Sequence, residues 1–303
     1  MAEVHHFTYG AFNPIAAYLL AFLGSFLGLL CAGRARAART RGRRNRWLII
    51  AAFSIGGAAI WLMHFAAMLG FDVPASPVRF DIWLTVVSMV LAVIFVGIGL
   101  MVVGHGRRRP LKTVAAGVIT GTGVLAMHYT GMAGMHISGH LYYRPTLVVA
   151  SGIIAMVAAT VALWFTQAVK GMAPITGAAA VMAIAVCGMH YTGMAAMQVE
   201  VTPVGAAGVT GIRPLLMIVP MTLITAATII TMALSALQAM TEEEFTDGAG
   251  IPRRGVHAEH PWSLKQASQM AMRRNRPSPR PVPQRPVLPR PAPQRPAPAE
   301  SSS

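Results

Sequence analysis

Residues 127–132 read MHYTGM, residues 189–194 repeat the same six letters, and residues 63–68 read MHFAAM. The copies are 64 residues apart from His64 to His128, and 62 residues apart from His128 to His190. Repetition at a near-constant period indicates a chain built from repeated structural units. Each period is long enough for two helices of about 20 residues, the length that crosses a bilayer. The motif spacing therefore predicts three tandem helix hairpins.

The composition supports a membrane location. Hydrophobic residues make up 54% of the 303 residues and charged residues only 12%, whereas soluble domains carry about 25% charged residues. Seven apolar segments of membrane-span length are found at residues 12–33, 47–70, 82–104, 113–136, 146–169, 172–197 and 212–238. The sequence thus predicts an all-α membrane protein with seven transmembrane helices, arranged as three tandem hairpins plus one. The motifs lie near the ends of the second, fourth and sixth segments.

The loop charges predict the orientation. The loops after the first, third and fifth segments contain twelve Arg and Lys residues, seven of them between residues 34 and 46, and the opposite loops contain three. Loops rich in Arg and Lys stay in the cytoplasm. We therefore expect a membrane domain over residues 1–240 with its N-terminus outside, its C-terminus inside and all three motifs near the outer face. Because topology explains the net charge of +15, we do not expect nucleic acid as a partner.

Beyond the last apolar segment the composition changes. Residues 241–303 begin with three glutamates and continue as an alternation of arginine and proline. Such a composition buries too little apolar surface to fold. We expect residues 241–303 to form a disordered cytoplasmic tail.

Each motif places an imidazole and thioethers on one side of a helix. The last methionine of a copy follows its histidine by four residues, which is about one helical turn. In the second copy Met135 and His136 would extend this face, and in the third copy Met197 would do so. A histidine inside a membrane span indicates function, and imidazole with thioether suits copper, particularly Cu(I). We expect the three histidines to share one site. The residues alone leave open copper or another soft metal, haem or an organic ligand, and a metal-free polar network.

The two MHYTGM stretches resemble the signature of the MHYT domain, a bacterial integral membrane sensor family, and the resemblance covers about residues 10–240. It implies a multi-pass protein of the bacterial plasma membrane that senses oxygen, carbon monoxide or nitric oxide through bound copper. In the first copy Phe65 replaces the motif tyrosine, and Ala66 and Ala67 replace threonine and glycine. The ligands carried over are His64, Met68, Met127, His128, Met132, Met189, His190 and Met194, with Tyr129 and Tyr191 as cofactor-binding residues.

These features predict a sensor that is not an enzyme. Many members of the family carry an output domain after the helices, but a tail of about 65 residues rich in proline is too short for one. A diatomic gas or a redox change would act at the outer face, and the signal would pass through the lipid-embedded helices to an unidentified cytoplasmic partner. The alternatives are a copper-handling or transport protein and a membrane protein with a metal-free packing network.

Overall fold

The computed structural model of the chain describes residues 8–201, residues 209–217 and scattered positions between 219 and 234. The chain divides into two compact units, Met1–Glu244 and Phe245–Ser303. The second unit, with nearly all of the predicted cytoplasmic tail, lies outside the described residues. The disorder of residues 241–303 therefore stays a prediction.

In the described part of the chain, six helices are long and apolar enough to cross a membrane: Phe12–Ala37, Arg41–Met68, Ile82–Gly104, Pro110–Ala133, Pro145–Ala168 and Met172–Ala196. They coincide closely with the first six predicted segments. The predicted seventh segment, 212–238, contains the short 3-10 helix η3 (Pro214–Met217) and otherwise lies mostly outside the described residues. The count of seven and the arrangement as hairpins stay predictions.

Local sequence signals set the helix ends. Asp81 caps α4 (Ile82–Gly104) by accepting a hydrogen bond of 2.8 Å from the backbone N–H of Leu84. Helices α5 (Pro110–Ala133) and α6 (Pro145–Ala168) begin with proline, whose missing N–H is not needed in the first turn. Gly171, at a φ of 85°, precedes α7 (Met172–Ala196), and this left-handed conformation favours glycine. The apolar runs between these signals form uninterrupted helices.

The six spans pack in chain order, and α7 contacts α1 (Phe12–Ala37). The second span consists of α2 (Arg41–Ala52), the π-helical segment η1 (Phe53–Leu62) and α3 (Met63–Met68). Its most apolar window is 83% buried, compared with 28–44% in the other five spans. Large apolar side chains such as Trp83, Leu111 and Ile184 are exposed, as expected for surfaces that face lipid. The second span is therefore the central helix of the bundle.

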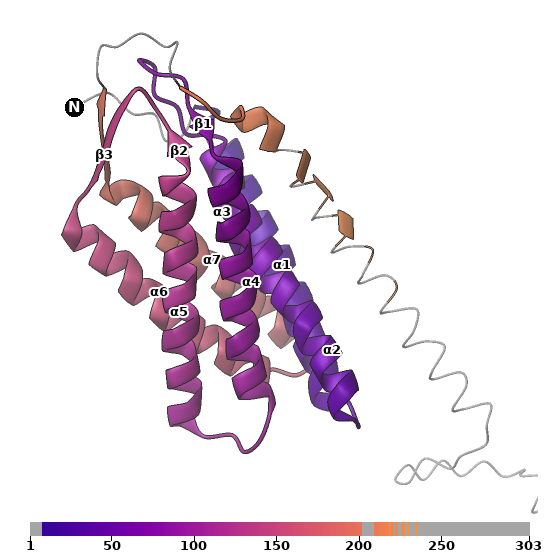
Figure 1. Cartoon of the computed structure of the whole chain (residues 1–303). Helices are drawn as coiled ribbons and strands as arrows, with labels where there is room; N and C mark the ends of the chain where they lie inside the picture. Colours follow the sequence, from indigo (N-terminus) through magenta and orange to yellow (C-terminus); the bar gives the residue numbers. More distant parts are fainter. Residues whose placement is uncertain are drawn as a thin grey trace, which may run out of the picture. The chain divides into compact units, whose positions relative to one another are not determined.

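Short strands lie at the motif end, and the arginine-rich turns lie at the other end (Figure 1). Strand β1 (Arg79–Phe80) pairs with β2 (Met135–His136), and β3 (Gly139–Tyr143) pairs with β4 (Met197–Val201), both antiparallel. The prediction that Met135, His136 and Met197 extend the helical motif faces is wrong. Helix α5 ends at Ala133 and α7 at Ala196, because these residues pair as strands instead.

Candidate metal centre

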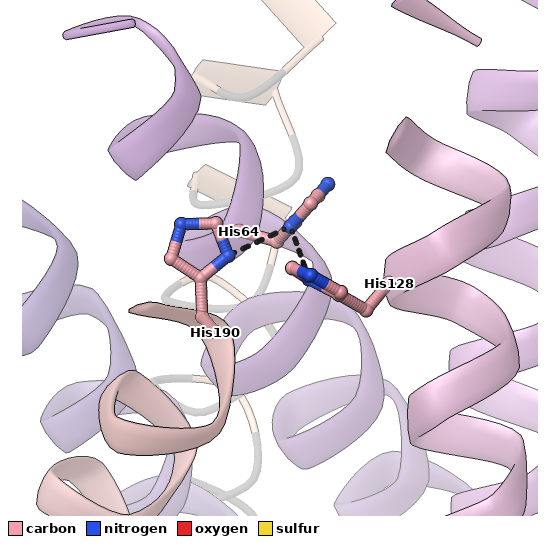
Figure 2. Close-up of side chains that lie close together, drawn as sticks. All are labelled: His64, His128 and His190. Carbon is pink, nitrogen blue, oxygen red and sulfur yellow. Dashed lines mark hydrogen bonds between the residues drawn. The ribbon is translucent and has the colours of Figure 1, made fainter. Parts of the chain in front are cut away.

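Three histidines from three different spans meet inside the bundle. His64 lies in α3, His128 near the end of α5 and His190 near the end of α7. Their side chains are 0%, 0% and 1% exposed. Figure 2 shows the three imidazole rings turned toward one another. The Nδ1 atom of His64 lies 3.0 Å from Nδ1 of His190 and 3.2 Å from Nδ1 of His128. We call these three residues the histidine triad.

The hydrogen bonds within the triad cannot all be satisfied by neutral rings. A neutral imidazole has one N–H and one lone pair. The Nδ1 atom of His64 therefore offers one hydrogen or one lone pair to two neighbouring Nδ1 atoms. In addition, the Nε2 atoms of His64 and His128 are buried and have no hydrogen-bond partner among the residues that the structure describes. A central cation would accept all three Nδ1 lone pairs, and each Nε2 would then carry the proton of a neutral ring.

The geometry also fits a metal ion. Imidazole nitrogens bind transition metals at about 2.0 Å, so three nitrogens on one ion lie about 3.3–3.5 Å apart. The two measured Nδ1 separations, 3.0 and 3.2 Å, need an expansion of only a few tenths of an ångström. One ligand atom from each histidine lies within 4.8 Å of those from the other two. Among the described residues, the histidine triad is the one cluster of three or more His, Cys, Asp or Glu side chains that could hold a metal ion.

Each motif glycine in the second and third copies packs against the histidine of the preceding copy. A Cβ atom added at Gly131 would lie 2.6 Å from Nε2 of His64, and one added at Gly193 would lie 2.3 Å from Nε2 of His128. Both distances are far shorter than van der Waals contact, so only glycine fits without displacing the ring. The first copy has Ala67 at this position. The glycines therefore set how deeply two of the imidazoles enter the triad.

The predicted methionine ligands share the burial of the histidines. All five are at most 4% exposed: Met68, Met127, Met132, Met189 and Met194. They belong to the main hydrophobic core. Their burial beside the triad is compatible both with packing and with ligation by sulfur, so a role as metal ligands stays a prediction.

The motif tyrosines contact their neighbouring histidines through the rings. The Tyr129 and His128 centroids are 4.9 Å apart, and those of Tyr191 and His190 are 5.0 Å apart. The Tyr129 hydroxyl lies 3.0 Å from Oγ of Ser151. Ser151 donates its own hydrogen to the Val148 carbonyl oxygen, so Tyr129 is the donor in this pair. Its hydroxyl therefore ties α5 to α6, and cofactor binding by Tyr129 and Tyr191 stays a prediction.

A further tyrosine extends this contact outside the spans. The ring of Tyr143 lies edge-on to Tyr129, with centroids 5.5 Å apart. Burial and, secondarily, the nearby Tyr129 raise the pKa of Tyr143 from 10.0 to about 12. Tyr143 is therefore a neutral phenol at any physiological pH.

Phe65, which replaces the motif tyrosine in the first copy, is part of a buried aromatic cluster. Its ring is 1% exposed and lies 4.9 Å from Trp61 and 5.8 Å from Phe80, measured between centroids. Trp61 donates from Nε1 to the Thr85 carbonyl oxygen at 3.2 Å. The absence of a hydroxyl suits this surrounding, because a buried polar group needs a partner.

Sequence reasoning missed two residues that position the motif ends. Asn13 of α1 donates from Nδ2 to the Ala66 carbonyl oxygen of the first motif at 3.1 Å and is 4% exposed. Ser151 holds Tyr129 as described above. Both Asn13 and Ser151 are polar residues in otherwise apolar segments, and this feature could have indicated their roles.

Comparison with known proteins identifies the repeat. The family model described as the bacterial signalling protein N-terminal repeat, MHYT, matches residues 57–116 and 121–179. These ranges include the first and second motif copies. The third copy, with His190, follows the second matched range. No solved structure matches the chain.

Two similar proteins come from Pseudomonas aeruginosa. The chain is 38% identical over 196 residues to the bifunctional diguanylate cyclase/cyclic di-GMP phosphodiesterase MucR, covering 63% of this chain and 28% of MucR. It is 33% identical over 200 residues to the cyclic di-GMP phosphodiesterase NbdA, covering 64% of this chain and 25% of NbdA. The similar part thus spans about a quarter of each relative.

A third relative is the signaling protein YkoW of Bacillus subtilis, 27% identical over 203 residues, which are 63% of this chain and 24% of YkoW. The family match and the six apolar helices together establish a multi-pass membrane protein. Residues 57–179 thus contain tandem MHYT repeats, which are described as the N-terminal repeat of bacterial signalling proteins.

Proposed function

We propose that this protein is a membrane sensor that binds one copper ion at the histidine triad. The observation that carries the proposal is the convergence of three buried Nδ1 atoms, with separations of 3.0 and 3.2 Å from His64. Imidazole alone suits zinc, copper, iron and nickel. The motif methionines, which lie within four residues of these histidines in the sequence and are at most 4% exposed, would favour the softer Cu(I) as sulfur ligands.

The surroundings of the triad support a sensing role for the copper. Copper held by three imidazoles would offer a coordination position to a diatomic gas such as oxygen, carbon monoxide or nitric oxide, or would change its oxidation state. The protein supplies the rigid, water-excluding pocket, because the three histidines are nearly completely buried. Each histidine comes from a different span, so a change in the ligand distances would alter the packing of α3, α5 and α7.

The signal would then pass to a cytoplasmic partner. Two of the relatives named above, MucR and NbdA, are cyclic di-GMP enzymes in which the similar part is about a quarter of the length. We propose that the part of this chain that is similar to these relatives is a sensing part. Its partner would be an output protein that contacts the cytoplasmic end of the helices.

A metal analysis of the full-length protein tests this proposal. The protein, purified in mild detergent and exposed to copper under reducing conditions, should retain one copper per chain by elemental analysis. The double variant His128→Ala/His190→Ala should lose it. The matched control is His136→Ala/His140→Ala, since His136 bonds to the Thr210 carbonyl oxygen and His140 is exposed. This control should keep the copper.

The same samples separate the alternatives. Stoichiometric copper followed by an infrared band of bound carbon monoxide would support gas sensing. Copper uptake into sealed proteoliposomes would instead indicate transport, although the described residues show no second cluster of metal ligands along the bundle. Folded protein that takes up no copper, zinc or iron would leave the third candidate, a metal-free network held by the Nδ1 contacts, and would refute the metal sensor.

A further inference from the structure

A cavity lies at the opposite end of the bundle from the triad. It has a volume of about 170 Å³ and is lined by α1, α2, α6 and the turn between α4 and α5. One water molecule needs about 10–15 Å³ of such space. The cavity therefore has room for a polyatomic ligand.

Three arginines line this cavity, one each from α1, α2 and the turn between α4 and α5: Arg36, Arg44 and Arg108. Arg36 is held in place because its guanidinium donates to the carbonyl oxygens of Thr166 and Val169, the latter at 2.6 Å. Nε of Arg44 is buried and has no hydrogen-bond partner in the described ranges. The charges of Arg36 and Arg108 repel each other.

No carboxylate from the described part of the chain balances these charges. Within residues 8–201 the acidic residues are Asp72, Asp81 and Glu200. Asp81 caps the start of α4 at the motif end, and Glu200 lies in β4. Asp72 lies in the loop between α3 and β1. All three are thus at the far end of the bundle from the arginine-lined cavity.

Phosphate oxygens match this set of donors. The planar fork of arginine binds phosphate in a bidentate manner, and such charge-assisted bonds are about twice as strong as neutral ones. A phosphate group has enough oxygens to face three guanidinium groups at once. Arg44 also lies in the first turn of α2, where the positive end of the helix dipole favours an anion. Gln167 also lines the cavity and adds a polar side chain to it.

We propose that the cavity lined by Arg36, Arg44 and Arg108 binds a phosphate group at the cytoplasmic end of the bundle. Two sources share this chemistry: the headgroup of an anionic phospholipid of the inner leaflet, and a soluble phosphate compound. The site is separate from the histidine triad, and the argument for it does not use copper binding.

Binding measurements on the full-length protein test the site. Inorganic phosphate is titrated calorimetrically into protein stripped of lipid in neutral detergent. In parallel, the protein is reconstituted in two kinds of nanodisc, one of phosphatidylcholine alone and one that also contains phosphatidylglycerol. The protein is then released from the nanodiscs, and native mass spectrometry identifies the lipid that stays bound to it. Arg44→Gln and Arg108→Gln should each weaken binding by about 10- to 100-fold, the loss expected for a charge-assisted hydrogen bond.

Matched controls are Arg41→Gln and Arg107→Gln, which remove the same charge from exposed neighbours outside the cavity and should bind nearly as the parent does. Arg36 is not substituted, because its hydrogen bonds to the carbonyl oxygens of Thr166 and Val169 tie α1 to the end of α6. Phosphate binding in detergent supports a soluble ligand, and selective retention of phosphatidylglycerol supports a lipid headgroup.

Two results would overturn the proposal. One is an equal effect of Arg44→Gln and Arg41→Gln in folded protein, as judged by circular dichroism and gel filtration. The other is phosphate binding only after Glu242, Glu243 and Glu244 are replaced by glutamine. In that case the chain's own carboxylates are the ligand of the arginines.

Discussion

Substitution of a single glycine should open the proposed copper site without harming the helix that contains it. In Gly193→Ala, the new Cβ would lie 2.3 Å from Nε2, 2.9 Å from Cδ2 and 3.2 Å from Cε1 of His128. To restore a contact of about 3.5 Å, the imidazole must move by about 1 Å. Metal sites tolerate deviations of about 0.2 Å in ligand distance, so His128 could no longer share the ion.

The expected loss is about 10- to 100-fold in copper affinity, the range found when the support of a ligand is removed. The assay is competition for Cu(I) against a chelator of known affinity, on purified protein. Gly131→Ala should behave similarly but more mildly, because its Cβ would lie 2.6 Å from Nε2 of His64.

Two glycines of the same helix provide the control. A Cβ added at Gly177 or Gly188 meets no atom within 4 Å. Alanine there should keep the parental copper affinity and stabilise the helix by up to about 1 kcal/mol. If folded Gly193→Ala binds copper as tightly as Gly188→Ala does, the imidazole of His128 is not held by this contact and the reasoning fails.

Three further outcomes follow from the site. Phe65→Tyr would bury a hydroxyl on the Cζ atom, which lies 3.6 Å from the position of a Cβ added at Gly131. This change should lower stability by about 1–3 kcal/mol, seen as a lower melting temperature; an unchanged melting temperature would show that the site has room for a partner or a water. Ser151→Ala removes the acceptor of Tyr129 and should cost about 1 kcal/mol while the copper content stays the same; loss of copper would assign Tyr129 a role at the metal. Acidification should release copper, because protons compete for the same Nδ1 lone pairs; copper retained until the protein unfolds would argue against ligation by the triad.

Six of the spans and the placement of the three motifs at one end of the bundle were predictable from the sequence, because long apolar runs and periodic repeats are strong signals. The equal placement of the motifs also indicated that His64, His128 and His190 could meet. Which ring nitrogens face each other was not predictable, since this depends on side-chain rotation. The contact of Gly193 with His128 crosses from one repeat to another, so no local pattern reports it.

The ends of the spans were less predictable. Met135 and His136 repeat the Met-His pair of the motif in α5, so no local signal marks them as a strand. Their pairing with β1 depends on a partner strand some 55 residues away in the sequence. The π-helical segment Phe53–Leu62 also has no distinct composition, because it is apolar like residues 47–52 before it and residues 63–68 after it. The cavity at Arg44 and Arg108 joins charges that, in the sequence, look like ordinary cytoplasmic loop residues.

The central span has a consequence for the two ends of the molecule. It carries Arg44 near its start and His64 near its finish, about 30 Å apart along a helix, with the π-helical segment between them. A π-helical turn holds one residue more than an α-helical turn, so its relaxation would shift the two halves in register. Any factor by which copper changes phosphate affinity must equal the factor by which phosphate changes copper affinity. Thermodynamic reciprocity would then let phosphate at the arginine-lined cavity adjust the copper affinity of the histidine triad at the other end of the bundle.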